Sequence, residues 1–215
     1  MASSNRQFSY QDELSYYAQP PERYPGYDRL LPYLKLLHAD PGRLFGSKRI
    51  LDLGAGECAF TGLIAEQLQP AAIVALELIR SRMIPAKRFL RSDRLHFVQG
   101  SCYELPFPDS YFDLVFGDLV LHHLPRLPLA VSEIRRVLTP GGSYVGLEPN
   151  FLNPVRLALS VWGGGSRNEH VLWPRVIRGA FRAQGFGSVE IGYVWHRFPK
   201  LRNSLLASEM AIRAS

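Results

Sequence analysis

The stretch KRILDLGAGECAF, residues 48–60, decides the fold. Its first half is a short apolar run, typical of a buried strand, that stops at Gly54-Ala55-Gly56. Two glycines one residue apart allow a sharp turn and let the backbone approach a ligand. An amphipathic stretch follows over residues 60–68. A strand, a glycine turn and a helix in this order indicate the opening unit of a nucleotide-binding α/β fold, in which free N–H groups face the ligand.

The rest of the chain continues the alternation of strands and helices. Strands that alternate with helices indicate βαβ units and a mainly parallel sheet. The sequence therefore predicts an α/β, Rossmann-like, doubly wound sheet of seven strands with helices on both faces. Further strands are predicted at 72–76, 95–99, 112–116, 143–147, 188–195 and 209–214, and further helices at 79–90, 127–138 and 174–184.

Two segments depart from this alternation. Residues 1–42 are polar, rich in Tyr and interrupted by Pro before one helical pattern, and they are interpreted as an N-terminal flap and helix. Residues 43–215 form the α/β domain. Within it, residues 151–173 contain three consecutive glycines and are predicted to be a lid or insertion over the carboxyl ends of the strands. We expect the flap and the lid to close over the site together.

The positive charge is concentrated in the C-terminal third. Residues 1–150 carry 16 Lys and Arg and 16 Asp and Glu, whereas residues 151–215 carry 9 and 3, which accounts for the net charge of +6. A basic region of this kind is either a solvated face or a surface for an anionic substrate, a membrane or nucleic acid. The chain has no apolar run of transmembrane length and an N-terminus without the apolar core of a signal peptide, so a cytoplasmic protein is expected.

An acid follows the glycine turn at the spacing of a nucleotide site. A dinucleotide fingerprint has an acidic residue about 20 positions after its glycines, to accept hydrogen bonds from the ribose hydroxyls. Glu77, at the end of the second strand, is in that place, but the third glycine is replaced by Cys58. These features alone do not separate a nicotinamide cofactor from S-adenosylmethionine. Cys58 and Cys102 are interpreted as small packing residues, and no metal site is predicted because further ligands are not nearby in sequence.

Three later segments separate the two cofactors. They are VQGSCYELPF at 98–107, FDLV at 112–115 and EIRRVLTPGG at 133–142. With the glycine turn, they resemble class I S-adenosylmethionine-dependent methyltransferases over about residues 48–150. The branch that the chain is most similar to is type 11-like and modifies quinones and natural products. The resemblance implies a methyltransferase that uses S-adenosylmethionine, forms S-adenosylhomocysteine and acts on a small-molecule acceptor.

The resemblance also implies a cofactor site. Ser101 stands where the family usually has Asp, and its hydroxyl accepts a weaker hydrogen bond than a carboxylate does. On the matching positions, Asp52, Gly54, Ala55 and Gly56 would surround the methionine part, Glu77 would hold the ribose, Leu78, Ser101 and Cys102 would line the adenine, and Asp118 would lie by the methionine amine.

The reacting end is predicted after the fourth and fifth strands. An oxygen or nitrogen acceptor must lose a proton, which calls for a base near pH 7. In related natural-product O-methyltransferases, a matching histidine pair and an acid that ends the fifth strand are implicated in this step. The matching residues are His122, His123 and Glu148, which we interpret as catalytic, although a packing or capping role is the alternative for each histidine. His170, on the predicted lid, is a further candidate.

Other functions remain open at this stage. Residues 117–120 lack the Asn/Asp-Pro-Pro-aromatic motif of enzymes that methylate exocyclic amines, and no Pro-Cys pair is present for attack on a pyrimidine. A nucleic acid substrate is therefore disfavoured. The alternatives are a nicotinamide oxidoreductase and a catalytically silent protein that binds S-adenosylmethionine or modulates a partner.

Overall fold

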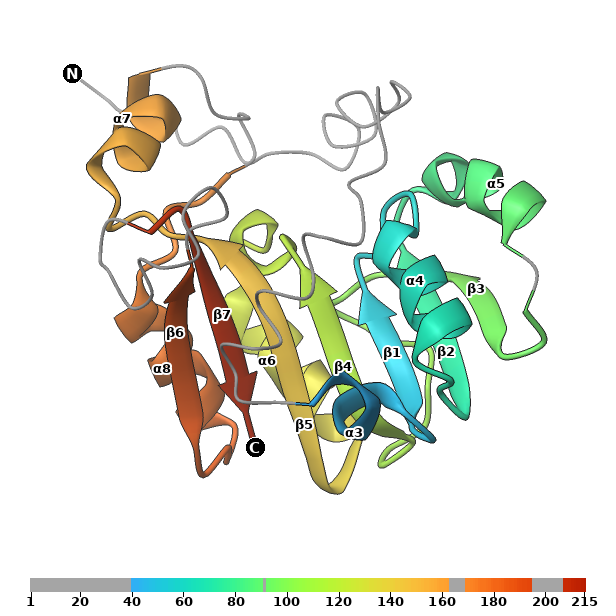
Figure 1. Ribbon diagram of the computed structural model, residues 1–215. Helices are drawn as coiled ribbons and strands as arrows, with labels where there is room; N and C mark the ends of the chain where they lie inside the picture. The colour runs from blue at the N-terminus through green and yellow to red at the C-terminus, as the bar shows by residue number, and fades with distance from the viewer. Residues whose placement is uncertain (1–39, 91, 163–168, 195–206) are drawn as a thin grey trace.

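The computed structural model describes residues 40–90, 92–162, 169–194 and 207–215. Seven strands form one sheet in the order β3-β2-β1-β4-β5-β7-β6 (Figure 1). The first five strands are parallel, and β7 runs antiparallel to both of its neighbours. The predicted doubly wound, mainly parallel sheet is therefore confirmed. The strands are β1 Arg49–Leu53, β2 Ala72–Glu77, β3 Leu95–Gln99, β4 Phe112–Asp118, β5 Leu138–Pro149, β6 Val189–Val194 and β7 Glu209–Ala214.

Helices cover both faces of this sheet (Figure 1). On one face, buried side chains of α3, α4 and α5 form a core with β1, β2 and β4. On the other face, α6 and α8 form a second core with the sheet. The helices are α3 Pro41–Phe45, α4 Ala59–Gln67, α5 Arg80–Phe89, α6 Leu127–Val137, α7 Pro154–Trp162 and α8 Pro174–Ala183, with a 3₁₀ turn, η2, at Leu121–His123.

The order of the strands reverses between β1 and β4. The chain winds outward from β1 through β2 to β3, then returns to the other side of β1 with β4 and β5. Ligands of open α/β sheets bind at this reversal, beyond the carboxyl ends of the strands. The segments that meet there are the glycine turn after β1 and residues 118–123 after β4.

One strand differs from the sequence prediction in its bounds, and the two segments outside the alternation are described only in part. Strand β5 begins at Leu138 rather than at residue 143, because Pro140-Gly141-Gly142 forms an irregularity in its pairing with β4 instead of a loop. The predicted lid, 151–173, contains helix α7, and residues 163–168 lie outside the described part of the chain. Residues 1–39 of the predicted N-terminal flap and helix, 1–42, also lie outside it.

Candidate functional site

The turn after β1 needs three residues with positive φ. Gly54, Gly56 and Cys58 have φ of 68°, 54° and 62°. A side chain at Gly54 would strike Val120, because a Cβ there would lie 2.5 Å from the Val120 Cγ2 atom. The turn after β1 thus packs directly on the segment after β4. The left-handed backbone at Cys58 is one that glycine adopts without steric cost, whereas a side chain there costs conformational energy.

Cys58 is a packing residue in this turn. Its thiol is buried and lies 3.6 Å from the carbonyl oxygen of Gly56. Burial raises the pKa of the Cys58 thiol to about 12, and the nearby Asp52 carboxylate raises it further. A thiol with so high a pKa is not a nucleophile near pH 7. The described residues contain no group of three or more His, Cys, Asp or Glu side chains that could hold a metal ion.

Glu77 connects the end of β2 to the glycine turn. Its side chain is buried, its Oε2 accepts from the Gly56 N–H at 2.9 Å, and its Oε1 accepts from the Ile79 N–H at 3.0 Å. A carboxylate has about four acceptor positions, so these two bonds leave capacity for ribose hydroxyls. Sequence reasoning placed Glu77 at the ribose but missed that it also fixes the turn.

Three carboxylates gather where β1, β2 and β4 end. Asp52 is buried and accepts a hydrogen bond from the Thr61 hydroxyl. Burial raises the pKa of Asp52 to about 7; the Thr61 bond opposes this rise, and the charges of Asp118 and Glu77 add to it. A ligand that brings positive charge to these carboxylates would relieve their mutual repulsion. S-adenosylmethionine has an ammonium and a sulfonium group, so this group of three carboxylates fits it.

The raised pKa of Asp52 predicts a pH-dependent stability. Between about pH 3.8 and pH 7 the folded chain holds a proton on Asp52 that the unfolded chain has released, so this group's contribution to stability falls as the pH rises. Asp52→Asn removes that titration. We expect the free energy of unfolding of the variant, relative to wild type, to rise by about 2.5 kcal/mol between pH 5 and pH 8.

Urea unfolding at both pH values, without cofactor, measures this difference. Asp113→Asn, at the half-buried Asp113 near the start of β4, is the matched control for an Asp-to-Asn change outside this group of three carboxylates. A constant difference between Asp52→Asn and wild type across the range would show that Asp52 is ionised in the folded protein.

The residues predicted to line the adenine ring, Leu78, Ser101 and Cys102, are called the adenine edge. Leu78, Ser101 and Cys102 are all half-buried and lie beyond the ends of β2 and β3. The Ser101 hydroxyl oxygen accepts from the Tyr103 N–H at 3.1 Å, which turns the chain at this point. The N–H of Gly100 donates to the carbonyl of Glu77 at 3.2 Å, so the edge is joined to the predicted ribose site.

His122 and Glu148 form a buried pair at the ends of β4 and β5. The Nδ1 atom of His122 lies 2.7 Å from Oε2 of Glu148, and both side chains are almost fully buried. Glu148 also accepts backbone N–H groups of Val120, Leu121 and His122 at 2.7–3.2 Å. The acid thus caps the 3₁₀ turn η2 and holds the imidazole at the same time, and sequence reasoning missed the capping.

The other two histidines lie around His122 in different ways. The ring of His123 lies beside that of His122, with centroids 4.0 Å apart and the ring planes tilted by 40°. The backbone N–H of His170 donates to the carbonyl oxygen of His122 at 2.8 Å, while its side chain is exposed. The structure therefore brings all three histidines together, and the imidazole of His122 lies against Glu148.

An ion pair between Arg82 and Glu57 also supports the glycine turn. Arg82, on α5, donates to Oε1 of Glu57 through Nε at 2.9 Å and Nη2 at 2.6 Å. Its guanidinium also lies over Gly56, where a Cβ would come within 3.1 Å of Nη2. Sequence reasoning missed this pair, and the only signal for it was the basic polar side of the helix.

Comparisons with known proteins give this arrangement a family. Residues 51–146 match the family model described as a methyltransferase domain. Over this stretch, just under half of its length, the chain matches a methyltransferase domain, as its motifs predict. Enzymes of this class take the methyl group from S-adenosylmethionine and form S-adenosylhomocysteine. The sequence resemblance is thereby confirmed, and the nicotinamide alternative is set aside.

Curated relatives of this methyltransferase domain include O-methyltransferases. A malonyl-[acyl-carrier protein] O-methyltransferase from Methylococcus capsulatus is 32% identical over 150 residues, which are 66% of this chain and 53% of that protein. A fatty-acid O-methyltransferase from Mycolicibacterium smegmatis is 35% identical over 98 residues, 46% of this chain and 36% of that protein. The chain thus spans about half or less of the length of these relatives.

Solved structures support the fold of the methyltransferase domain. A S-adenosylmethionine-dependent methyltransferase from Mesorhizobium loti has a TM-score of 0.66 at 18% identity, over 80% of this chain and 92% of that one. At this identity the likeness establishes the fold alone. Among the described residues, no helix has the length and apolar character needed to cross a membrane.

Proposed function

We propose that this protein transfers a methyl group from S-adenosylmethionine to an oxygen atom of a small molecule, with His122 as the general base. Bound S-adenosylmethionine supplies an electrophilic methyl group on a sulfonium. The observation that supports this proposal is the buried contact of 2.7 Å between His122 Nδ1 and Glu148 Oε2 at the ends of β4 and β5. Glu148 and the glycine turn come together there because β1, β4 and β5 are parallel neighbours.

The pair is suited to removing a proton from a hydroxyl group. A carboxylate on Nδ1 selects the tautomer with the proton on that nitrogen, which leaves the lone pair on Nε2. Nε2 would then accept the acceptor's proton as its oxygen attacks the methyl group. Glu148 would stabilise the imidazolium that forms, because the pair is held away from water.

A carboxylic acid is the second candidate acceptor. The relatives named above act, by their names, on a malonyl-acyl carrier protein and on fatty acids. A carboxylate is already ionised near pH 7, so its methylation needs no general base. The basic C-terminal third, which includes the exposed Arg175 and Arg182 of α8, is compatible with an anionic substrate. In this case His122 would orient the carboxylate rather than deprotonate it.

One experiment separates the two acceptors and tests the function. Purified protein is incubated with S-adenosylmethionine and either a phenol, an aliphatic alcohol or a C8–C16 fatty acid, and S-adenosylhomocysteine is measured between pH 5.5 and 9. For a hydroxyl acceptor we expect the rate to fall about 10² to 10⁴-fold in His122→Gln. A rate with fatty acid that survives in His122→Gln would favour the carboxylate. Cofactor binding without turnover of any acceptor would favour the silent binder.

A further inference from the structure

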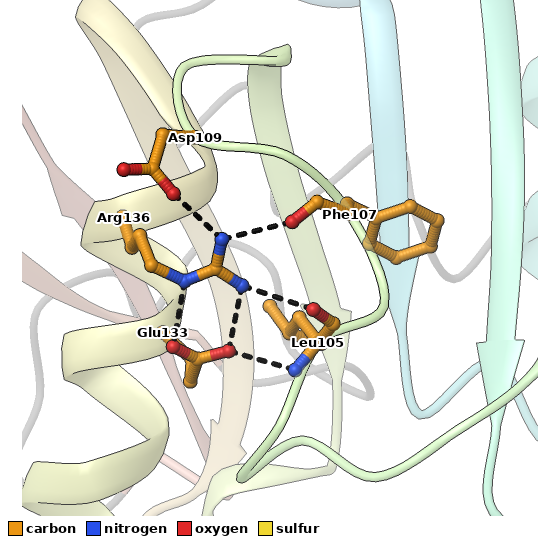
Figure 2. Close-up of polar contacts among 5 residues, drawn as sticks. All are labelled: Leu105, Phe107, Asp109, Glu133 and Arg136. Carbon is orange, nitrogen blue, oxygen red and sulfur yellow. Dashed lines mark hydrogen bonds and ion pairs between the residues drawn. The ribbon is translucent and has the colours of Figure 1, made fainter.

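Arg136 joins helix α6 to the loop between β3 and β4 (Figure 2). Its Nη1 donates to the Phe107 carbonyl and to Asp109 Oδ1, both at 2.8 Å, and its Nη2 donates to the Leu105 carbonyl at 2.9 Å. Nε and Nη2 also donate to the two carboxylate oxygens of Glu133 at 2.8 Å. Glu133 Oε2 in turn accepts from the Leu105 N–H at 2.7 Å. We call Glu133 and Arg136 the α6 clamp.

The α6 clamp leaves no guanidinium donor unused. Arginine has five N–H groups in a fixed plane, and the five contacts of Arg136 account for all of them. Hydrogen bonding to Arg136 lowers the pKa of Glu133, as expected for a carboxylate fixed by a cation. A lysine has only three donors around one point and cannot reach the same set of acceptors.

The α6 clamp binds the backbone of Leu105 and Phe107, which flank Pro106. Pro106 in turn packs against Gly100, beside the residues predicted to line the adenine. A Cβ at Gly100 would lie 3.3 Å from Pro106 Cδ and 2.9 Å from Leu76 Cδ1, so the proline ring and Leu76 cover this glycine closely. Ser101 and Cys102 follow Gly100 directly. Within the same loop, the N–H of Glu104 donates to the carbonyl of Ser101 at 3.3 Å. A continuous chain of contacts therefore joins the α6 clamp to the backbone of Ser101 and Cys102.

From this chain of contacts we propose that Glu133 and Arg136 are positioning residues for the cofactor. They hold the loop from Gly100 to Asp109 so that Ser101 and Cys102 meet the adenine ring, and neither clamp residue touches the cofactor. The proposal rests on the assignment of Ser101-Cys102 as the adenine edge. It predicts a defect in adenine recognition, with the chemistry of methyl transfer unchanged once the cofactor is bound.

The test compares Arg136→Lys with the matched control Arg135→Lys. Arg135 precedes Arg136 on α6 and lies over the Phe186 ring, 5.5 Å from its centroid, outside the α6 clamp. Calorimetry gives the affinity for S-adenosylhomocysteine and for its inosine analogue, in which a carbonyl replaces the adenine amino group. In Arg136→Lys we expect the affinity for S-adenosylhomocysteine to fall about tenfold or more. The ratio of this affinity to the affinity for the inosine analogue should fall by a similar factor. Arg135→Lys should keep both values.

The test is completed by comparing KM for S-adenosylmethionine and kcat between wild type and Arg136→Lys, with any acceptor that wild type methylates. We expect Arg136→Lys to raise KM for S-adenosylmethionine while kcat at saturation stays within about threefold. If Arg136→Lys does not fold, Glu133→Gln takes its place, because it keeps the shape of the side chain and removes its charge. Unchanged affinity and unchanged preference in the folded variant would overturn the inference. Failure of wild type to bind S-adenosylhomocysteine would instead overturn the assignment of the cofactor site.

Discussion

Glu77→Ala is expected to weaken binding of S-adenosylhomocysteine more than a hundredfold. The change removes the carboxylate that would accept the ribose hydroxyls, a loss on the order of 3 kcal/mol for two charge-assisted bonds. It also releases the Gly56 and Ile79 N–H groups, which the carboxylate holds at 2.9 and 3.0 Å. The glycine turn would lose its support from β2, so the loss of affinity should exceed that of the ribose contacts alone. Isothermal calorimetry measures it.

The control for this prediction is Glu66→Ala. Glu66 is an exposed carboxylate on α4, and its removal changes the net charge by the same amount. Urea unfolding of both variants shows how much of the effect is lost stability, because buried N–H groups without acceptors are costly. An affinity for S-adenosylhomocysteine that stays the same in folded Glu77→Ala would refute the role of Glu77 at the ribose.

His122→Ala is expected to lower kcat by about 10² to 10⁴ with a hydroxyl acceptor and to leave cofactor affinity nearly unchanged. The physical reason is the buried contact between His122 Nδ1 and Glu148, which prepares the imidazole to accept a proton. Its predicted role is at the acceptor, so the ribose and adenine contacts should survive. Single-turnover kinetics and calorimetry measure the two quantities separately.

His123→Ala is the matched control for His122→Ala. His123 lies beside His122, with ring centroids 4.0 Å apart, whereas it is the His122 Nδ1 atom that contacts Glu148, so loss of His123 should slow turnover only mildly. The sequence alone did not say which of the two histidines is the base, and the position of Glu148 favours His122. If both variants keep more than about a third of wild-type turnover, a histidine base at this position is excluded.

Local patterns were enough to predict most of the sheet. The strands at β2, β3 and β7 are short apolar or alternating runs that local periodicity identifies. Helix α7 was missed because a short apolar run can be a buried strand or a helix, and periodicity does not separate the two. The early start of β5 was missed because Pro140-Gly141-Gly142 is also typical of a loop, and only the pairing of Leu138 with Phe112 makes it part of a strand.

The sequence by itself determined the glycine turn and the acid at Glu77, because these depend on spacing within a single βαβ unit, and it indicated the family through four motifs that occur in order between residues 48 and 142. Only the tertiary structure decided which histidine faces Glu148, since these residues are 26 positions apart and meet through the pairing of β4 with β5. The α6 clamp likewise depends on the packing of α6 against a loop about 30 positions earlier in the chain. Spacing along a chain specifies local backbone geometry, whereas contacts between distant side chains are set by the packing of the whole sheet.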